Sequence, residues 1–198
     1  MSEERIERLL AEVHDDFGMI RVFEVEDYRF LEFGDAIEQS CVFTTDPSWL
    51  EYDYTRAMLI CALCHEAPES ALFLGLGAGT LTQACLKFLP LEDVEAIELR
   101  PDVPRLAIEH LGLDDDPRLY IRIGDAVELL PSAEPADLIF VDLYNDLGPA
   151  PGHLAWTFLE SCQKKLQPNG WLVINQWATD DGKPLGAALL RGLFHRHY

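Results

Sequence analysis

Three acidic side chains of this chain, Glu98, Asp125 and Asp142, each follow closely on a short segment rich in apolar residues. A carboxylate in such a place can accept hydrogen bonds from sugar hydroxyls or from an amino group, and it can take a proton from an ammonium group. A glycine-rich turn at residues 75–79 follows another apolar run at residues 71–74. Glycine permits the unusual backbone angles of such a turn and lets a ligand approach the main chain. The combination predicts an enzyme that binds a nucleoside.

The spacing of the glycines indicates which kind of nucleoside. A dinucleotide site has the pattern G-x-G-x-x-G, which directs a helix N-terminus at a pyrophosphate. Here Gly75, Gly77 and Gly79 form G-x-G-x-G, which suits a cofactor without phosphates, such as S-adenosylmethionine. Glu98 lies about 20 residues further on, where an acidic side chain accepts hydrogen bonds from ribose hydroxyls in nucleoside-binding folds.

Two of the three acidic residues also have a purely structural interpretation. Asp125 precedes an expected helix and could cap its N-terminus instead of contacting an adenine ring. Glu98 could be a solvated strand end. Asp142 follows the apolar residues Phe140 and Val141, so its carboxylate must find hydrogen-bond partners or solvent in a cleft. We therefore expect a functional role for Asp142.

The elements that must position these residues alternate along the chain between strands and helices. Because the strand interiors are apolar, the pattern predicts an α/β, Rossmann-like fold with a mostly parallel sheet and helices on both faces. Ligands bind such sheets at the carboxyl ends of the strands, where all of the candidate residues fall. The expected strands are residues 72–75, 94–99, 119–123, 137–143 and 171–175, and the expected helices are residues 52–64, 80–88, 103–110, 126–130, 156–166 and 184–198.

The first 50 residues are expected to form an appendage. Apolar residues at helical spacing predict a helix over residues 2–13. Residues 18–33 then alternate in polarity, with a hairpin turn at Glu26-Asp27, and a third strand is expected within residues 34–48. The predicted organisation is a helix and small β appendage at residues 1–50, followed by a nucleoside-binding domain at residues 51–198.

The amino-acid composition restricts the kinds of molecule that the chain is expected to bind. The formal net charge is −20, which disfavours nucleic acid and favours a cationic substrate. The chain has no run of 18 apolar residues and begins with a polar, acidic segment, so we expect neither a membrane span nor a secretory signal, and we infer a cytoplasmic protein. Cys61 and Cys64 form a C-x-x-C within an apolar run, which predicts buried free thiols and no metal site.

Residues 39–176 resemble the spermidine synthases, aminopropyltransferases built on the class I methyltransferase fold. The resemblance implies that Asp142 and Tyr54 are catalytic, and that a small-molecule amine is the acceptor in a homodimeric protein. It assigns nucleoside binding to Gln39, Gly75, Gly77, Gly79, Glu98, Asp125 and Ala126, and acceptor contacts to Tyr144, Asn145 and Asp146. The matching segments are Gln39-Ser40, Asp46-Pro47, Glu51–Tyr54, Met58, Gly75–Gly79, Ile97-Glu98, Gly124–Ala126, Asp142 and Gly148–Ala150.

The chain also departs from the family pattern. The glycine loop of the family carries an aspartate at the position of Ala78, and the second aspartate of its catalytic motif is Asn145 here. Loss of the loop carboxylate removes a repulsion, which predicts that S-adenosylmethionine is bound at least as well as its decarboxylated form. Methyl and aminopropyl transfer are both left open, and authentic spermidine synthesis is disfavoured. The competing interpretation is a non-catalytic binding or assembly protein, since the C-terminal hairpin usual in methyltransferase folds is not evident.

Overall fold

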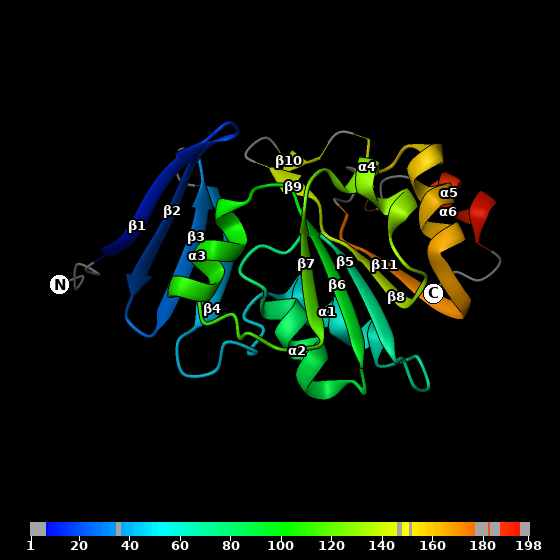
Figure 1. The fold of residues 1–198 in the computed structure, drawn as a ribbon, viewed down its shortest axis with the longest axis horizontal. Coiled ribbons are helices and arrows are strands. Elements are labelled where there is room, and N and C mark those ends of the chain that lie inside the picture. Colours follow the sequence, from blue (N-terminus) through cyan, green and yellow to red (C-terminus); the bar gives the residue numbers. More distant parts are fainter. Residues whose placement is uncertain are drawn as a thin grey trace.

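The computed structural model describes residues 7–34, 37–145, 148–150, 152–176, 182 and 187–194. Two sheets dominate these parts (Figure 1): a four-stranded antiparallel sheet, in the order β1-β2-β3-β4, and a five-stranded parallel sheet, in the order β11-β8-β5-β6-β7. A two-stranded ladder joins β9 (Tyr144–Asn145) to β10 (Gly148–Pro149). The predicted α/β, Rossmann-like class is confirmed.

The N-terminal sheet corrects one prediction. Its strands are β1 (Arg8–Asp15), β2 (Gly18–Val25), β3 (Tyr28–Phe33) and β4 (Ile37–Phe43). The helix expected over residues 2–13 is therefore wrong from Arg8 onwards, and residues 1–6 lie outside the described part. The apolar spacing suits a helix, but β1 pairs along its length with β2, and this non-local pairing decides the conformation. The hairpin turn at Glu26-Asp27 is confirmed.

The elements of the parallel sheet follow the predicted alternation. The prediction starts the last strand at residue 171, which is too late: β11 begins at Leu166 and takes in residues 167–170, where the register with β8 shifts. The strands are β5 (Ser70–Leu74), β6 (Asp93–Glu98), β7 (Leu119–Ile123), β8 (Ala136–Val141) and β11 (Leu166–Ile174). The helices are α1 (Asp53–Ala62), α2 (Thr80–Phe88), α3 (Asp102–His110), α4 (Ala126–Leu129), α5 (Trp156–Lys165) and α6 (Ala187–Leu193), with a 3₁₀ turn at Leu130–Ser132.

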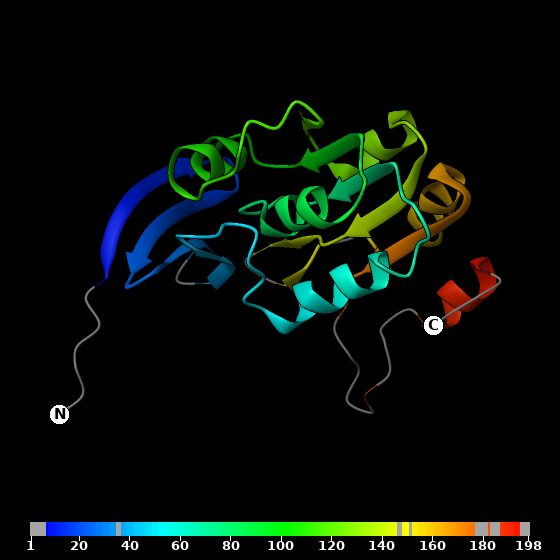
Figure 2. The ribbon, with the colours of Figure 1, turned by 90° about the horizontal axis from the view of Figure 1, so that it is seen from below.

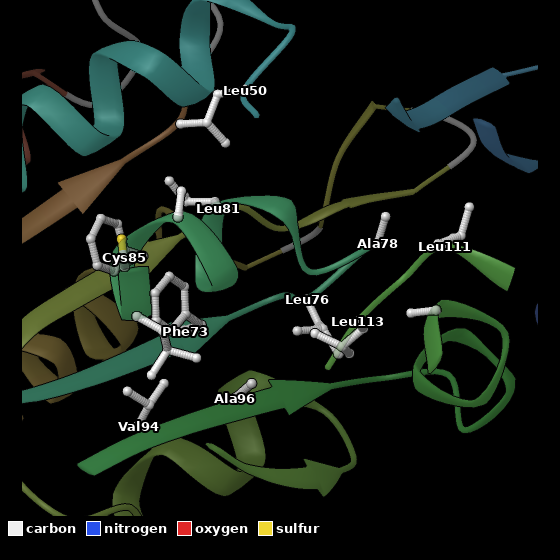
Figure 3. Packing of buried hydrophobic residues seen from close by; sticks show 14 of the residues in the cluster. Leu50, Phe73, Leu76, Ala78, Leu81, Cys85, Val94, Ala96, Leu111 and Leu113 are labelled. Atoms are coloured by element: carbon white, nitrogen blue, oxygen red, sulfur yellow. The ribbon is translucent and has the colours of Figure 1, made fainter. Parts of the chain in front are cut away.

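Side chains that alternate along the central strands divide the core into two clusters, one on each face of the sheet. Phe73 and Phe140 stack with ring centroids 4.6 Å apart on the face covered by α1, α2 and α3. Leu81 and Cys85 of α2 lie beside Phe73 (Figure 3). The opposite face packs against α4, α5 and α6. Helices therefore cover both faces of the sheet, as predicted, and Figure 2 shows α1, in cyan, along one of them.

The strand register brings the candidate residues to one edge. Leu74 of β5 is level with Ile97 of β6 and with Val141 of β8, and Val141 is level with Ile174 of β11. The residue that follows on each strand therefore lies at the same carboxyl edge. These residues are Gly75, Glu98, Asp142 and Asn175.

Three further observations concern the described residues. No helix among them is long and apolar enough to cross a membrane. No strand follows β11 in them. The prediction that Cys61 and Cys64 are buried is wrong, because both thiols are free but exposed. Cys61 lies off the buried stripe of α1, which carries Thr55, Met58 and Ala62, and Cys64 comes after the end of that helix. The domain boundary at residue 50 stays a prediction.

Candidate active site

A cavity of about 1060 Å³ opens at the carboxyl edge of the parallel sheet. Its walls come from β4, the start of α1, the glycine loop, the start of α4 and the ends of β6, β8 and β11. Gly79 does not line it, Asp146 lies outside the described residues, and so does the side chain of Asn145. The predicted site residues that line it are Gln39, Tyr54, Gly75, Gly77, Glu98, Asp125, Ala126, Asp142 and Tyr144.

The glycines of the loop are required by close packing. Gly75, Gly77 and Gly79 have φ of 94°, 56° and 77°, in the left-handed region that glycine tolerates. A Cβ on Gly77 would lie 2.7 Å from the Ser40 hydroxyl, and a Cβ on Gly79 would lie 2.7 Å from Leu113. At Gly75 a Cβ would collide with the backbone oxygen of Asp142. The loop thus seals against the N-terminal sheet and β8, and only part of it faces the cavity.

Glu98 holds this loop in place. The side chain is buried, and one carboxylate oxygen accepts the Leu76 N–H at 3.1 Å while the other accepts the Arg100 N–H at 3.0 Å. The Gly77 N–H also donates to it. Burial raises the pKa of Glu98, and these N–H groups oppose that rise. The solvated strand-end interpretation is therefore wrong. Ribose binding by Glu98 stays a prediction.

Ala78 does not face the cavity. Its side chain is fully buried in the core, and its N–H donates to the Ser40 hydroxyl at 3.1 Å. With Leu76 and Gly77 bound to Glu98, three successive N–H groups of the loop already have acceptors within the protein. The loop therefore offers a ligand carboxylate no free N–H group at these three residues, so the geometry adds no support to the expected binding of S-adenosylmethionine.

Asp125 adopts its structural alternative in this structure. Its Oδ1 accepts the Val127 N–H at 2.7 Å and caps α4. The residue also lines the cavity, and its second oxygen is not used by that cap, so the contact with adenine stays a prediction. Leu99 and Val127, which sequence reasoning did not single out, are each 40% exposed and line the same region. They offer an apolar surface on which a flat ring can pack.

At the other end of the cavity, Asp142 sits in a hydrogen-bonded network. Asn175 Nδ2 donates to Asp142 Oδ1 at 2.8 Å, and the Tyr54 hydroxyl donates to the same carboxylate. Burial raises the pKa of Asp142, and both hydrogen bonds oppose that rise. Burial and the nearby Asp142 charge raise the pKa of Tyr144 to about 12. Asn175 was not predicted, although it follows an apolar strand in the same way as Asp142.

The charge on the cavity wall is of one sign. Five acidic residues line the cavity, and no lysine, arginine or histidine is among the described lining residues. Tyr52 and Tyr54 stack at the wall with ring centroids 5.8 Å apart. Such a site attracts a cation and offers a ligand carboxylate no positive partner. The acidic residues are Glu38, Asp53, Glu98, Asp125 and Asp142.

Comparison with known proteins places this site in a family. The family model described as "Spermine/spermidine synthase domain" matches residues 51–179. A polyamine aminopropyltransferase of Nitrosomonas europaea is 29% identical over 197 residues, covering 96% of this chain and 58% of that protein. The corresponding protein of Chromobacterium violaceum is 27% identical over 165 residues, covering 81% and 62%. The chain thus spans about three fifths of the length of these relatives.

Solved structures agree on the fold. A spermidine synthase in complex with the transition-state analogue AdoDATO superposes with a TM-score of 0.80 at 22% identity, covering 96% of this chain and 66% of that one. Human methyltransferase-like protein 13 in complex with SAH gives a TM-score of 0.61 at 24% identity and covers 71% of both chains. Because the family model spans residues 51–179, well over half of the sequence, the chain belongs to the spermine/spermidine synthase family.

Proposed function

We propose that this chain transfers an aminopropyl group from decarboxylated S-adenosylmethionine to a small-molecule amine, as a step in polyamine biosynthesis. The observation that carries the proposal is the buried Asp142 carboxylate, held by Asn175 and Tyr54 at the end of a cavity with acidic walls. The relatives named polyamine aminopropyltransferases support the same reaction class.

The cavity fits the donor by charge. When bound, such a nucleoside supplies a carbon next to a positively charged sulfur, and that carbon bonds to the amine nitrogen as the sulfur leaves as a neutral thioether. Glu98 and Asp125 would hold the ribose and adenine, with Leu99 against the ring. Five acidic side chains favour a ligand that carries an ammonium group and no carboxylate.

The acceptor needs a free electron pair, whereas an alkylamine is largely protonated at neutral pH, with a pKa of about 10. Asp142 can take that proton, and its raised pKa brings it closer to the working pH, where a general base is most effective. Tyr54 and Tyr144 lie beside this carboxylate and would orient the nitrogen. Asn145 and Asp146 are proposed further contacts.

Methyl transfer from S-adenosylmethionine is the second candidate, because Ala78 replaces the family aspartate. The non-catalytic alternative is disfavoured by Asp142 itself. A buried carboxylate with a raised pKa weakens folding, and a protein that only assembles with others has no use for it. The homodimer and the cytoplasmic location stay predictions.

The test is calorimetric titration with S-adenosylmethionine and with its decarboxylated form, followed by mass spectrometry of products formed with a diamine. We expect the decarboxylated form to bind at least about tenfold more tightly, a difference of about 1.4 kcal/mol. We also expect the diamine to gain an aminopropyl group. Equal or tighter binding of S-adenosylmethionine with methylated product would establish the second candidate. Binding of both nucleosides without any product would support the non-catalytic alternative.

A further inference from the structure

One wall of the cavity belongs to the N-terminal sheet, which contributes Phe33, Glu38, Gln39 and Ser40. The position of this wall depends on how the sheet is attached to the rest of the chain. In Figures 1 and 2, α3 lies against the sheet, and β1 and β2 contact it. Arg100, which lies just before α3, makes the most deeply buried polar connection at this junction.

The Arg100 guanidinium binds three groups of the N-terminal sheet. It donates to both oxygens of Asp15, at 2.8 and 2.7 Å, and to the Gly18 carbonyl at 2.8 Å. Its carbon lies 4.4 Å from the centre of the Phe33 ring, in the geometry of a cation–π contact. Only 6% of the Arg100 side chain and 11% of the Asp15 side chain are exposed. We call this set, Arg100, Asp15, Gly18 and Phe33, the Arg100 clamp.

The other end of Arg100 reaches the nucleoside side of the cavity. Its backbone N–H donates to Glu98, whose second carboxylate oxygen accepts the Leu76 N–H of the glycine loop. Leu99, between the two, lines the cavity. A single residue therefore connects the N-terminal wall, through Phe33, to the carboxylate that shapes the loop.

The geometry points to Arg100 as a positioning residue that sets the N-terminal wall and the glycine loop in register for nucleoside binding. This inference deepens the proposed function and rests on it for the identity of the ligand. A planar guanidinium with donors in a fixed fork suits the task, because it binds both Asp15 oxygens in one orientation. Lysine carries the same charge but lacks the fork.

The chain offers a matched control. Arg29 of β3 donates to the His110 carbonyl at the end of α3, at 2.6 Å, and so joins the same sheet to the same helix. Arg29 also pairs with Glu24 at 2.9 Å. Neither Arg29 nor His110 lines the cavity. Loss of Arg29 therefore weakens the junction without touching the connection to Glu98.

The experiment compares Arg100→Met, Arg100→Lys, Asp15→Asn and Arg29→Met in the full chain. The first readout is hydrogen–deuterium exchange of the peptides that carry residues 72–80, without ligand. The second is calorimetric affinity for 5′-methylthioadenosine, a nucleoside that cannot react. We expect faster exchange of the loop in the Arg100 and Asp15 variants alone. We also expect affinity to fall about tenfold in Arg100→Met, a difference of about 1.4 kcal/mol, because Phe33 and the glycine loop both line the cavity. Arg100→Lys should fall between wild type and Arg100→Met.

The possible outcomes test the role of the Arg100 clamp and the proposed function independently. Equal effects of Arg29→Met and Arg100→Met on the loop and on affinity would reduce Arg100 to a stabilising residue and overturn the inference. Unchanged loop exchange in Asp15→Asn and Arg100→Lys would overturn it as well, even if Arg100→Met does not fold. A wild-type chain that binds neither S-adenosylmethionine, its decarboxylated form nor 5′-methylthioadenosine would overturn the proposed function, while the exchange readout would still decide whether the clamp orders the loop.

Discussion

The two ends of the cavity each hold a buried carboxylate whose pKa burial raises, but the two carboxylates are held in different ways. Glu98 is bound by backbone N–H groups of the glycine loop and of Arg100. Asp142 is bound by two side chains, Asn175 and Tyr54, from elements distant in sequence. A carboxylate that organises its own backbone is part of the fold. One held by side chains is free to exchange partners and protons during a reaction.

Replacement of Asp142 should have the largest effect on turnover and should distinguish most clearly between the roles of the two carboxylates. We expect Asp142→Asn to lower turnover by about 100- to 10,000-fold, the usual contribution of a general base. The amide keeps the shape and can still accept from Asn175, so thermal stability should stay the same or rise. Steady-state rates and melting temperatures of the variant and the wild type test both halves. A rate within threefold of wild type would remove Asp142 from the chemistry.

Replacement of Glu98, unlike replacement of Asp142, should lower the stability of the fold. Glu98→Ala leaves the N–H groups of Leu76, Gly77 and Arg100 without their acceptor. Each unsatisfied buried donor costs about 1–3 kcal/mol, so the free energy of unfolding should fall measurably in urea titrations. Nucleoside affinity should fall by about 1–3 kcal/mol as well if Glu98 binds the ribose. Full stability of this variant would contradict the structural role.

The pH dependence of the two properties should differ in sign. Asp142 acts as a base only when ionised, so kcat/KM should fall as pH decreases through its raised pKa. The contribution of Asp142 to the free energy of unfolding changes with pH in the opposite direction. The pKa of Asp142 in the folded protein lies above the ordinary value of 3.8. This group therefore stabilises the folded state fully below pH 3.8, and that stabilisation is lost as pH rises through the folded pKa. Asp142→Asn should remove this component of the stability profile. If the stability of Asp142→Asn depends on pH as that of the wild type does, another group is responsible for this pH dependence.

The smallest expected effect concerns Asp125. Asparagine caps helices about as well as aspartate, so Asp125→Asn should keep stability within about 0.5 kcal/mol, whereas Asp125→Ala should cost about 1 kcal/mol. If Asp125 only caps α4, Asp125→Asn should leave nucleoside affinity unchanged. A hydrogen bond accepted from the adenine amino group predicts weaker binding in both variants. Calorimetry with the two variants distinguishes the alternatives.

Features that depend on local chemistry could be predicted from the amino-acid sequence alone. Glycines at residues 75, 77 and 79 have positive φ, as a tight turn between β5 and α2 requires. Apolar strands that end in polar residues predicted the edge of the sheet where the cavity lies, and of the strands of the parallel sheet only β11 was misplaced by several residues. These features follow from the period of apolar residues and from steric limits on the backbone, which a single segment expresses alone.

Features that depend on pairing between distant segments could not be predicted in this way, because they arise only in the folded chain. Residues with helical spacing became β1 because β2 supplies its hydrogen bonds. The Glu98 carboxylate turned toward the glycine loop, and Ala78 turned into the core. Asn175 reached Asp142 only because β11 and β8 are adjacent and in register. No local pattern carries such information, since the free energy that fixes these contacts comes from burial and hydrogen bonds formed across the assembled fold.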